Sequence, residues 1–460
     1  MPGGRARHFR QNGFMFDMGP SWYWMPDIFE RYFQCFGKKV SDYYQLTRLD
    51  PSYRIYYPDG PMDIPADYNA LRSLFESIES GSAAKLDAFL KEAAYKYEVG
   101  INKLVHKPSR SLTEFIDVDL AKGIFRLDVF TSMKQHIRKY VSHPKLVQLL
   151  EFPVLFLGAL PAQIPALYSL MNYADIKLGT WYPQGGMYQI VAGMHQLATE
   201  LGVDFRFNHE VQSIQVDHGT ARTVTVKING NEQTQLKADV IVGGADYQHI
   251  DQHLLPAEVR SYSPAYWNKR VMAPSCLLYY IGLNKKIPGL THHSLFFDVD
   301  FDQHGNEIYT DPAWPAEPLF YVGAPSVTDS TVAPAGNENL FFLIPVAAGL
   351  EGDTEEIRRR YFEKIVTRFE QRLGVTVKDA ICYYRSYSVS DFQTDYHAFK
   401  GNAYGLANTL RQTAILKPSI KSKKISNLYY TGQLTVPGPG VPPSLISGEV
   451  VSKEIIKAFK

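Results

Sequence analysis

Hydrophobic and polar positions alternate along two short stretches near the start of the chain, residues 9–16 and 53–64. A period of two places every second side chain on one face, so both stretches are predicted to form β-strands. Between about 66 and 150 the period lengthens, and apolar residues recur at i, i+3 and i+4 over 66–78, 83–104 and 127–140. This spacing predicts amphipathic helices.

Helix and strand patterns mix through the rest of the chain. Residues 187–202 and 354–374 predict helices that end at Gly202 and Gly374, because glycine readily adopts the left-handed conformation of a helix C-cap. Predicted strands are 203–208, 211–216, 222–229, 233–238, 239–246, 272–284, 318–325 and 340–349. Residues 425–460 predict a strand, a Gly/Pro-rich loop and a helix. The pattern therefore indicates a mixed α+β chain of the α/β class.

One stretch, residues 152–171, is apolar enough to suggest a membrane. It carries no charged side chain, but its three prolines would interrupt a membrane-spanning helix. Two interpretations stay open: a buried helix pair, or a patch that enters one leaflet of a bilayer. A basic run later in the chain would be a solvated loop or a contact for anionic lipid. Its members are Lys417, Lys421, Lys423 and Lys424.

Charge and cysteine content narrow the function classes. The 460 residues include 48 Lys and Arg against 47 Asp and Glu, a net charge of +1, so a nucleic-acid partner is not expected. The three cysteines are far apart and form no C-x-x-C, which favours a reducing compartment and argues against a zinc site. His292 and His293 lack companion ligands, so we interpret them as a surface or strand-end pair and expect no metal.

Two glycine-containing segments are candidates for a nucleotide site. The strand at 239–246 ends in Gly243-Gly244, but no complete G-x-G-x-x-G follows it or occurs elsewhere in the chain. The segment TGQLTVPGPGVPPSLISG at 431–448 combines a strand end, a tight loop and a helix expected to begin near Ser444. A helix N-terminus with free N–H groups can hold an electron-rich ligand edge, whereas the alternative is a simple Pro-rich turn.

The N-terminal residues favour the ligand-binding interpretation. Pro2-Gly3-Gly4-Arg5-Ala6, followed by F-x-F-D-x-G-P at 14–20, resembles the turn and strand along the flavin pyrophosphate in bacterial and fungal carotenoid desaturases, the phytoene desaturase group of FAD-dependent oxidoreductases. Four more segments are similar to motifs of that group and keep their order: WYPQGGMYQIVAGM at 181–194, HHSLFFD at 292–298, AP-S-VTDST-VAP at 324–334 and NLYYTGQLTVPGPGVPPSLISG at 427–448. The resemblance covers essentially the whole chain.

The resemblance implies a Rossmann-like FAD-binding lobe assembled from separated stretches. It places the parts of this lobe at 1–65, 181–250 and 424–460. A helical, membrane-facing lobe is expected at 66–180 and a substrate-binding lobe at 251–423. In that group a βαβ unit with G-x-G-x-x-G comes directly before Gly-Gly-Arg, and such a unit needs about 30 residues. We therefore expect the given chain to be a fragment whose FAD-binding lobe is incomplete at the N-terminus.

The same resemblance implies FAD as the cofactor. The residues expected to bind it are Gly3, Gly4, Arg5, Ala6, Asp17, Gly19, Pro20, Val211, Asp246, Gly432, Gln433, Gly440, Val441, Pro442 and Ser444. The polar stretch before G-N-A-Y-G offers Asp395, His397 and Lys400 as catalytic candidates, with solvated loop residues as the alternative interpretation.

The activity that the resemblance implies is desaturation of phytoene in successive steps. A hydride leaves an allylic carbon for the flavin, the neighbouring carbon loses a proton, and a double bond forms. A substrate without polar groups needs an apolar tunnel, which the 30 Tyr, 26 Phe and 5 Trp could line. A quinone or dioxygen would accept the electrons. The lipophilic substrate favours a cytoplasmic protein held peripherally on the inner membrane face, and the oligomeric state is not indicated.

Three alternatives stay open. The chain would be a desaturase or isomerase of another carotenoid, for example a 3,4-desaturase of a hydroxylated carotenoid. It would be an amine oxidase of the same flavin superfamily, for which a polar, aromatic-caged amine site is the distinguishing feature. Or it would be a carotenoid-binding protein with little flavin, because the N-terminal nucleotide-binding unit is absent from the given sequence.

Overall fold

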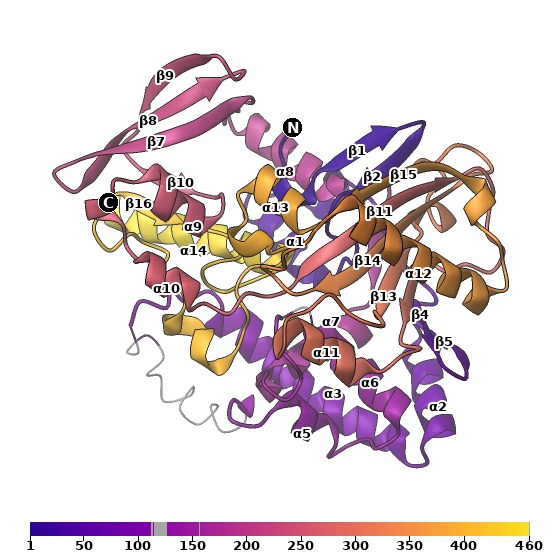
Figure 1. Ribbon diagram of the computed structural model, residues 1–460. Helices are drawn as coiled ribbons and strands as arrows, with labels where there is room; N and C mark the ends of the chain where they lie inside the picture. The colour runs from indigo at the N-terminus through magenta and orange to yellow at the C-terminus, as the bar shows by residue number, and fades with distance from the viewer. Residues whose placement is uncertain (112–113, 115–126, 156, 460) are drawn as a thin grey trace.

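Figure 1 shows the computed structural model of the chain, which describes residues 1–111, 114, 127–155 and 157–459. The described strands are β1 His8–Gln11, β2 Phe14–Asp17, β3 Leu46–Arg48, β4 Tyr53–Tyr57, β5 Gly60–Ile64, β6 Trp181–Pro183, β7 His209–Asp217, β8 Thr220–Ile228, β9 Glu232–Lys237, β10 Ile241–Gly243, β11 Ser275–Leu283, β12 His293–Phe296, β13 Phe320–Gly323, β14 Glu338–Val346, β15 Ile381–Tyr387 and β16 Leu428–Tyr430.

The described α-helices are α1 Pro26–Gln34, α2 Tyr68–Ile78, α3 Ser82–Val99, α5 Met133–Ile137, α6 Pro144–Leu155, α7 Leu170–Ile176, α8 Tyr188–Glu200, α9 Tyr247–His249, α10 Pro264–Asn268, α11 Phe301–Tyr309, α12 Glu355–Leu373, α13 Val389–Tyr396 and α14 Val441–Phe459. The helix predictions for 66–78, 83–104, 187–202 and 354–374 are confirmed in their main parts. Asp67 begins α2, since its side chain accepts a hydrogen bond from the Ala70 N–H at 2.8 Å.

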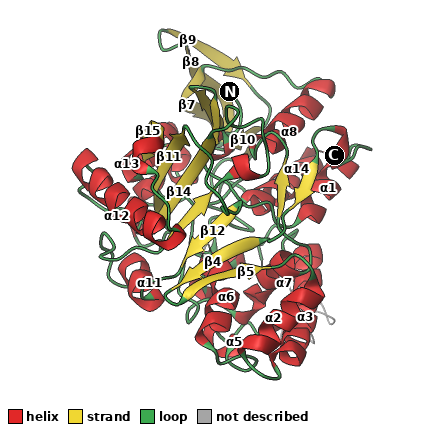
Figure 2. Cartoon of the chain, turned by 90° about the vertical axis from the view of Figure 1, so that its right-hand side faces the viewer, coloured by secondary structure: helices red, strands yellow, loops and turns green. Residues whose placement is uncertain are grey.

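The centre of the molecule is a seven-stranded sheet in the order β15-β11-β14-β13-β12-β4-β5. Along β11 successive residues face opposite sides: Tyr279 belongs to a core shared with α12, whereas Tyr280 belongs to a core shared with β2 and the helices. Because both faces are covered, the strand is buried throughout and its sequence is almost continuously apolar. In Figure 2 this sheet lies between the helical layer below it and α12.

The division of the chain into lobes remains a prediction, but the seven-stranded sheet contains strands from two of the predicted lobes, 1–65 and 251–423. β4, expected with the FAD-binding segments, is parallel to β12 from the 251–423 segment, with Ile55 opposite Leu295, and β5 pairs with β4 at the edge of the sheet. The two parts of the chain therefore share one sheet.

The apolar segment 152–171 is mostly buried among the described residues. Val154, Ile164 and Ala166 have no exposed surface, and the segment continues from the end of α6 to the start of α7. This favours the buried interpretation over a patch that enters a bilayer. Among the residues that the structure describes, no helix is both long enough and apolar enough to cross a membrane.

Two predicted elements are wrong. Residues 203–208 are not a strand, because β7 starts at His209 opposite Ile228, where β8 ends, and the strands that the structure describes leave them no partner. In the predicted helix 127–140 only Met133–Ile137 is α-helical, since Ser132 caps the helix by accepting from the Gln135 N–H at 3.2 Å.

Candidate flavin site

The candidate site begins where two parallel strands end. β10 and β16 pair in parallel, with Gly243 opposite Tyr430, and the Thr431 N–H donates to the Gly243 carbonyl at 3.0 Å. The chain therefore leaves both strands through glycine, at Gly244 and Gly432, on the same edge. In open α/β folds the carboxyl edge of parallel strands is where nucleotides bind.

Gly432 leaves open space beside its backbone. Its φ is +103°, a conformation that favours glycine, and a Cβ built there would meet no atom within 4 Å. The Gly432 N–H donates to Ser447 Oγ at 3.1 Å, which ties this turn to the following helix. The neighbouring Gln433 donates from Nε2 to Asn402 Oδ1 at 3.0 Å.

Helix α14 follows this loop directly. It begins at Val441, three positions before the predicted start at Ser444, because Gly440 adopts a φ of +111° and its carbonyl accepts from the Ser444 N–H at 3.0 Å. Val441, Pro442 and Ser444 thus belong to the first turn of a 19-residue helix. The N-terminus of such a helix carries a partial positive charge that suits an electron-rich ligand edge.

Arg5 reaches the same region from the N-terminus. Its Nη2 donates to the Asn402 carbonyl at 3.2 Å, and its guanidinium lies 5.1 Å from the ring centre of Tyr396. Its Nε is enclosed and has no hydrogen-bond partner among the described residues. Burial lowers the pKa of Arg5, opposed by the attraction of the buried Asp246 carboxylate. An enclosed donor without a partner is a position where an anionic ligand group would be stabilised.

The glycines around Arg5 allow a close backbone approach. The turn Gly4–Ala6 is closed by an Ala6 N–H to Gly3 carbonyl hydrogen bond of 2.8 Å, and a Cβ on Gly4 would meet nothing within 4 Å. A Cβ on Gly19 would lie 2.4 Å from the Arg5 carbonyl oxygen. Gly19 therefore lies directly against the Arg5 turn, and Pro20 follows it in the sequence.

Asp17 is bound to protein groups. Its carboxylate accepts hydrogen bonds from the Met187 and Tyr188 N–H groups at 2.7 and 2.9 Å, at the start of α8. Burial raises the pKa of Asp17 to about 6 against the effect of these two donors. Its evident role is to join β2 to α8, and the expected contact with the cofactor stays a prediction.

Asp246 and Val211 occupy different surroundings. The Asp246 carboxylate, 4% exposed, caps α9 by accepting from the Gln248 and His249 N–H groups and also accepts from the Phe399 N–H at 3.1 Å. Burial raises the pKa of Asp246, while Arg5 lowers it. Val211 is 37% exposed on β7, opposite Val226 in the separate three-stranded sheet β7-β8-β9.

The three catalytic candidates have separate partners. Asp395 pairs with Arg7 and accepts from the Tyr387 hydroxyl at 3.0 Å. His397 ends α13 and stacks on His249 with ring centres 4.0 Å apart. Lys400 Nζ donates to the Asn268 carbonyl at 3.3 Å. Each of the three side chains therefore has its own structural partner, and these contacts do not bring the three together as a catalytic group.

An aromatic cluster lies where the segment after Pro20 meets α6. Trp22 stacks on His293 with ring centres 4.1 Å apart and lies 5.3 and 6.0 Å from the rings of Tyr53 and Phe152. His293 Nδ1 and the Tyr321 hydroxyl are 2.7 Å apart. The surface interpretation of His292 and His293 is wrong, since they are 6% and 1% exposed. The strand-end interpretation is right for His293, the first residue of β12.

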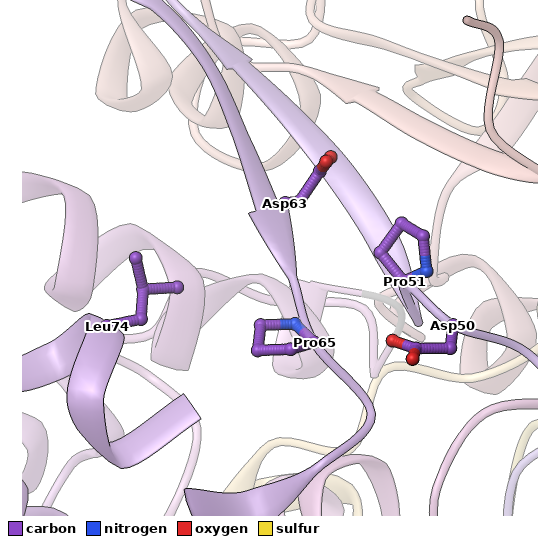
Figure 3. A pocket seen from close by; sticks show the side chains of 5 residues that line it. All are labelled: Asp50, Pro51, Asp63, Pro65 and Leu74. Atoms are coloured by element: carbon purple, nitrogen blue, oxygen red, sulfur yellow. The ribbon is translucent and has the colours of Figure 1, made fainter. Parts of the chain in front are cut away.

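Two surface hollows lie away from this site. One of about 330 Å³ lies between α2, the end of β5 and the residues just before β4 (Figure 3), and its lining contains none of the predicted site residues. Its lining residues are Asp50, Pro51, Asp63, Pro65 and Leu74. A neighbouring hollow of about 520 Å³ shares Asp50.

The residues around Arg5 and Gly432 fit a flavin nucleotide. They combine an enclosed cationic donor, open glycine turns and a helix N-terminus at one strand edge. Hydrogen bonds link Arg5 to Asn402, 397 positions away, and Asn402 to Gln433, 31 positions further along the chain. Asn402 and Ser447 were missed from the sequence, because their roles depend on these long-range contacts.

Comparison with known families decides the class. The model of the family described as "Flavin containing amine oxidoreductase" matches residues 1–456. The chain belongs to this family. It is accordingly an FAD-dependent flavoprotein and an oxidoreductase.

Relatives of this flavoprotein are carotenoid enzymes. It is 40% identical over 457 residues to the carotenoid 3,4-desaturase of Haloarcula japonica, covering 99% of this chain and 91% of that protein. It is 31% identical to the 4,4'-diapophytoene desaturase of Staphylococcus aureus over 99% of this chain and 92% of the relative. The ζ-carotene-forming phytoene desaturase of Myxococcus xanthus is 28% identical, with 99% and 87% covered.

Solved structures agree on the fold. An oxidoreductase from Methanosarcina mazei has a TM-score of 0.60 at 15% identity and covers 98% of this chain and 92% of its own. Cyclohexylamine oxidase from Brevibacterium oxydans has a TM-score of 0.52 at 13% identity, with 100% and 92% covered. The mixed α/β fold of an FAD-dependent oxidoreductase is therefore confirmed.

Proposed function

We propose that this flavoprotein desaturates a carotenoid. The observation that carries the proposal is the 40% identity to a carotenoid 3,4-desaturase over 99% of the chain. The aromatic cluster of the half-buried Trp22 with the buried Tyr53 and Phe152 supports it, since a hydrocarbon polyene needs apolar walls rather than polar handles. The family match fits both a carotenoid and an amine substrate, and the likeness to cyclohexylamine oxidase concerns the fold alone, so neither favours the amine oxidase alternative.

Among carotenoids we propose an already conjugated polyene as the first substrate to test, with introduction of a 3,4 double bond. Phytoene is the second, because the phytoene and diapophytoene desaturases are more distant relatives at 28% and 31% identity. This order reverses the preference that the sequence motifs alone implied.

In this proposal the protein binds the cofactor and the substrate, orients them, and excludes water from the reacting carbons. FAD supplies a two-electron acceptor when bound. Arg5 would hold an anionic part of the cofactor, the turns at Gly4 and Gly432 would leave room for it, and the N-terminus of α14 would face its electron-rich edge. The aromatic cluster excludes water from the developing positive charge on the polyene.

The test uses purified protein loaded with FAD and supplied with either carotenoid in detergent micelles. Desaturation extends the conjugated system, so we expect absorbance to move to longer wavelength and the product to lose two hydrogens by mass spectrometry. Conversion of the conjugated polyene but not phytoene supports the proposed order. Conversion of cyclohexylamine and of neither carotenoid would contradict the proposal.

We also propose peripheral contact with the cytoplasmic face of a membrane and reoxidation by a quinone or dioxygen. A lipid-soluble substrate supports the first, and the contact would not use the buried segment 152–171. Exposed apolar side chains suited to it include Phe130, Leu410 and Leu416, which are 81%, 44% and 49% exposed. Flotation with lipid vesicles tests the contact, and substitution of all three residues by serine should abolish it.

A further inference from the structure

Lys417 differs from the rest of the basic run in which it lies. Its side chain is buried, with 5% of the residue exposed, whereas Lys423 and Lys424 are exposed. Its Nζ is enclosed and has no hydrogen-bond partner among the described residues. Neither the lipid contact nor the solvated loop expected from the sequence applies to this residue. An enclosed cation without a partner is costly, so the position requires an explanation.

The surroundings of Lys417 connect the candidate flavin loop with the apolar segment. A Cβ built on Gly438 would lie 3.0 Å from Lys417 Nζ and 2.9 Å from Asn408 Oδ1, so both atoms lie against this glycine. Gly438 belongs to the loop between Gly432 and α14. The Asn408 N–H donates to the Leu157 carbonyl at 2.8 Å, which places Asn408 against the apolar segment 152–171.

Asn408 Oδ1 is a second enclosed atom without a partner. It is an acceptor, whereas a lysine with a proton on Nζ is a donor, and neither atom bonds to the other in the structure. Burial alone lowers the pKa of Lys417 to about 7, and no carboxylate, imidazole or other charged group of the described residues contributes. Near neutral pH a large share of the side chains are therefore neutral amines with a free lone pair.

We propose that Lys417 accepts the proton that the polyene loses during desaturation, with Asn408 as a positioning residue. This role rests on the proposed function. Bound oxidised FAD would supply the two-electron acceptor for the hydride that leaves one C–H bond of the substrate. The neighbouring C–H bond gives its proton to the Nζ lone pair, and its electron pair becomes the second bond of the new C=C. The products would be a polyene with one more double bond, reduced FAD and an ammonium on Lys417.

The surroundings of Lys417 suit both of its charge states. Before the step a neutral amine does not repel the positive charge that develops on the polyene, as an ammonium would. After the step the ammonium can donate to Asn408 Oδ1, which then gains the partner that it lacks. His293 Nε2 is another enclosed nitrogen without a partner, but burial holds the pKa of His293 well below its ordinary value, so it is the weaker base.

The experiment compares wild type with Lys417→Met, Asn408→Leu and a control, Lys269→Met, which changes an exposed lysine at the end of α10. Each protein is loaded with FAD, and carotenoid desaturation is followed in single turnover from pH 5.5 to 9. We expect the wild-type rate to rise with pH through about 7, as the amine becomes neutral. In Lys417→Met the rate should no longer rise with pH through about 7, and it should be about 10²–10⁴-fold lower than in wild type. Asn408→Leu should shift the pH at which the rate rises, and Lys269→Met should have the same rate and pH dependence as wild type.

A second measurement follows the amine without turnover. Because the folded pKa lies below the unfolded one, the unfolded chain binds this proton more tightly between about pH 7 and the usual lysine value near 10.5. Wild-type stability against urea should therefore rise with pH in this range relative to Lys417→Met. If stability against urea depends on pH equally in the two proteins, Lys417 is not a neutral amine near pH 7 and the proposal is overturned.

The outcomes separate this role from the proposed function. If wild type converts a carotenoid and Lys417→Met keeps the same pH limb and rate, the role of Lys417 is overturned and the function stands. If no carotenoid is converted by any of the proteins at any pH, the proposed function fails, and the role of Lys417 fails with it.

Discussion

Substitution of Arg5 by lysine tests whether its positive charge alone, or also its set of hydrogen-bond donors, is needed to bind FAD. Arg5→Lys keeps a cation near Asp246 but loses the enclosed Nε and the planar fork of donors. A lost hydrogen bond to a charged group costs about 1.5–3 kcal/mol, so the dissociation constant for FAD should rise roughly 10- to 100-fold. Titration of flavin fluorescence measures it. Arg10→Lys, on the exposed end of β1, is the control, and equal affinity in both variants would contradict this assignment.

Asp175 should make stability depend on pH. It accepts from the Tyr53 hydroxyl at 2.7 Å and the Thr180 hydroxyl at 3.2 Å, and burial raises its pKa to about 7 from 3.8. Because the folded state holds this proton more tightly than the unfolded chain, the stabilisation is present below about pH 4 and is lost as pH rises through about 7.

Asp175→Asn removes this titration and keeps the shape of the protonated acid. Urea unfolding of both proteins from pH 4 to 8 measures the effect. The stability of wild type relative to the variant should fall with rising pH, by on the order of 1.4 kcal/mol per pH unit within the window. A difference that stays constant from pH 4 to 8 would show that Asp175 is ionised throughout.

The sequence allowed individual site residues to be predicted where the backbone conformation requires a particular residue type. The glycines at 3, 4, 19 and 432 lie in turns or close approaches that only glycine accommodates well, and such positions recur as motifs. Asp17 shows the limit of this reasoning, because its partners at the start of α8 are 170 and 171 positions away. Lys417 shows it again, since burial is decided by the packing of Gly438 and Asn408 rather than by a local basic run.

At the scale of elements, periodicity succeeded where a helix or strand has one partner face or a defined cap. The long helix α12 matches its prediction from the Thr354 cap to Gly374, which has a φ of +67°. The failure at 203–208 has a different cause, since a strand needs a neighbour and β8 ends before it could supply one. Local pattern carries no information about the length of a partner.

The loop before α14 permits a matched test of Gly432. Gly432 and Gly374 both have a positive φ and open space where a Cβ would point. Gly432→Ala and Gly374→Ala should therefore lose similar stability, about 1–2 kcal/mol, from the left-handed backbone. Only Gly432→Ala places a methyl group in the proposed flavin space, so only this variant should lose the flavin absorbance after desalting.

Either of two results would contradict that expectation. Equal flavin retention would mean that the space beside Gly432 does not face the cofactor. Equal loss of flavin would mean that general destabilisation, rather than this space, controls binding. Urea unfolding of both variants without FAD supplies the stability comparison on which the interpretation depends.

For the whole molecule, the fold class was predictable and the assembly was not. Alternation and helical periodicity indicated a mixed α/β chain, and motif order indicated a flavin lobe built from separate stretches. The order of the seven-stranded sheet, with β4 beside β12, follows from packing between residues more than 200 positions apart. The contacts of Arg5 with Asn402 and of Arg7 with Asp395 likewise join the two ends of the chain.

This assembly makes global stability sensitive to the cofactor. A ligand that binds only the folded chain stabilises it by RT ln(1 + [L]/Kd), about 2.7 kcal/mol at a hundredfold excess over Kd. Because the proposed site joins the N-terminal turn, the 402 segment and α14, FAD should raise the melting temperature in a saturable way. Calorimetry with increasing FAD measures it. FAD should raise the melting temperature of Gly374→Ala as much as that of wild type, from a lower starting value, and that of Gly432→Ala little or not at all. An equal rise in wild type and both variants would place the cofactor away from this junction.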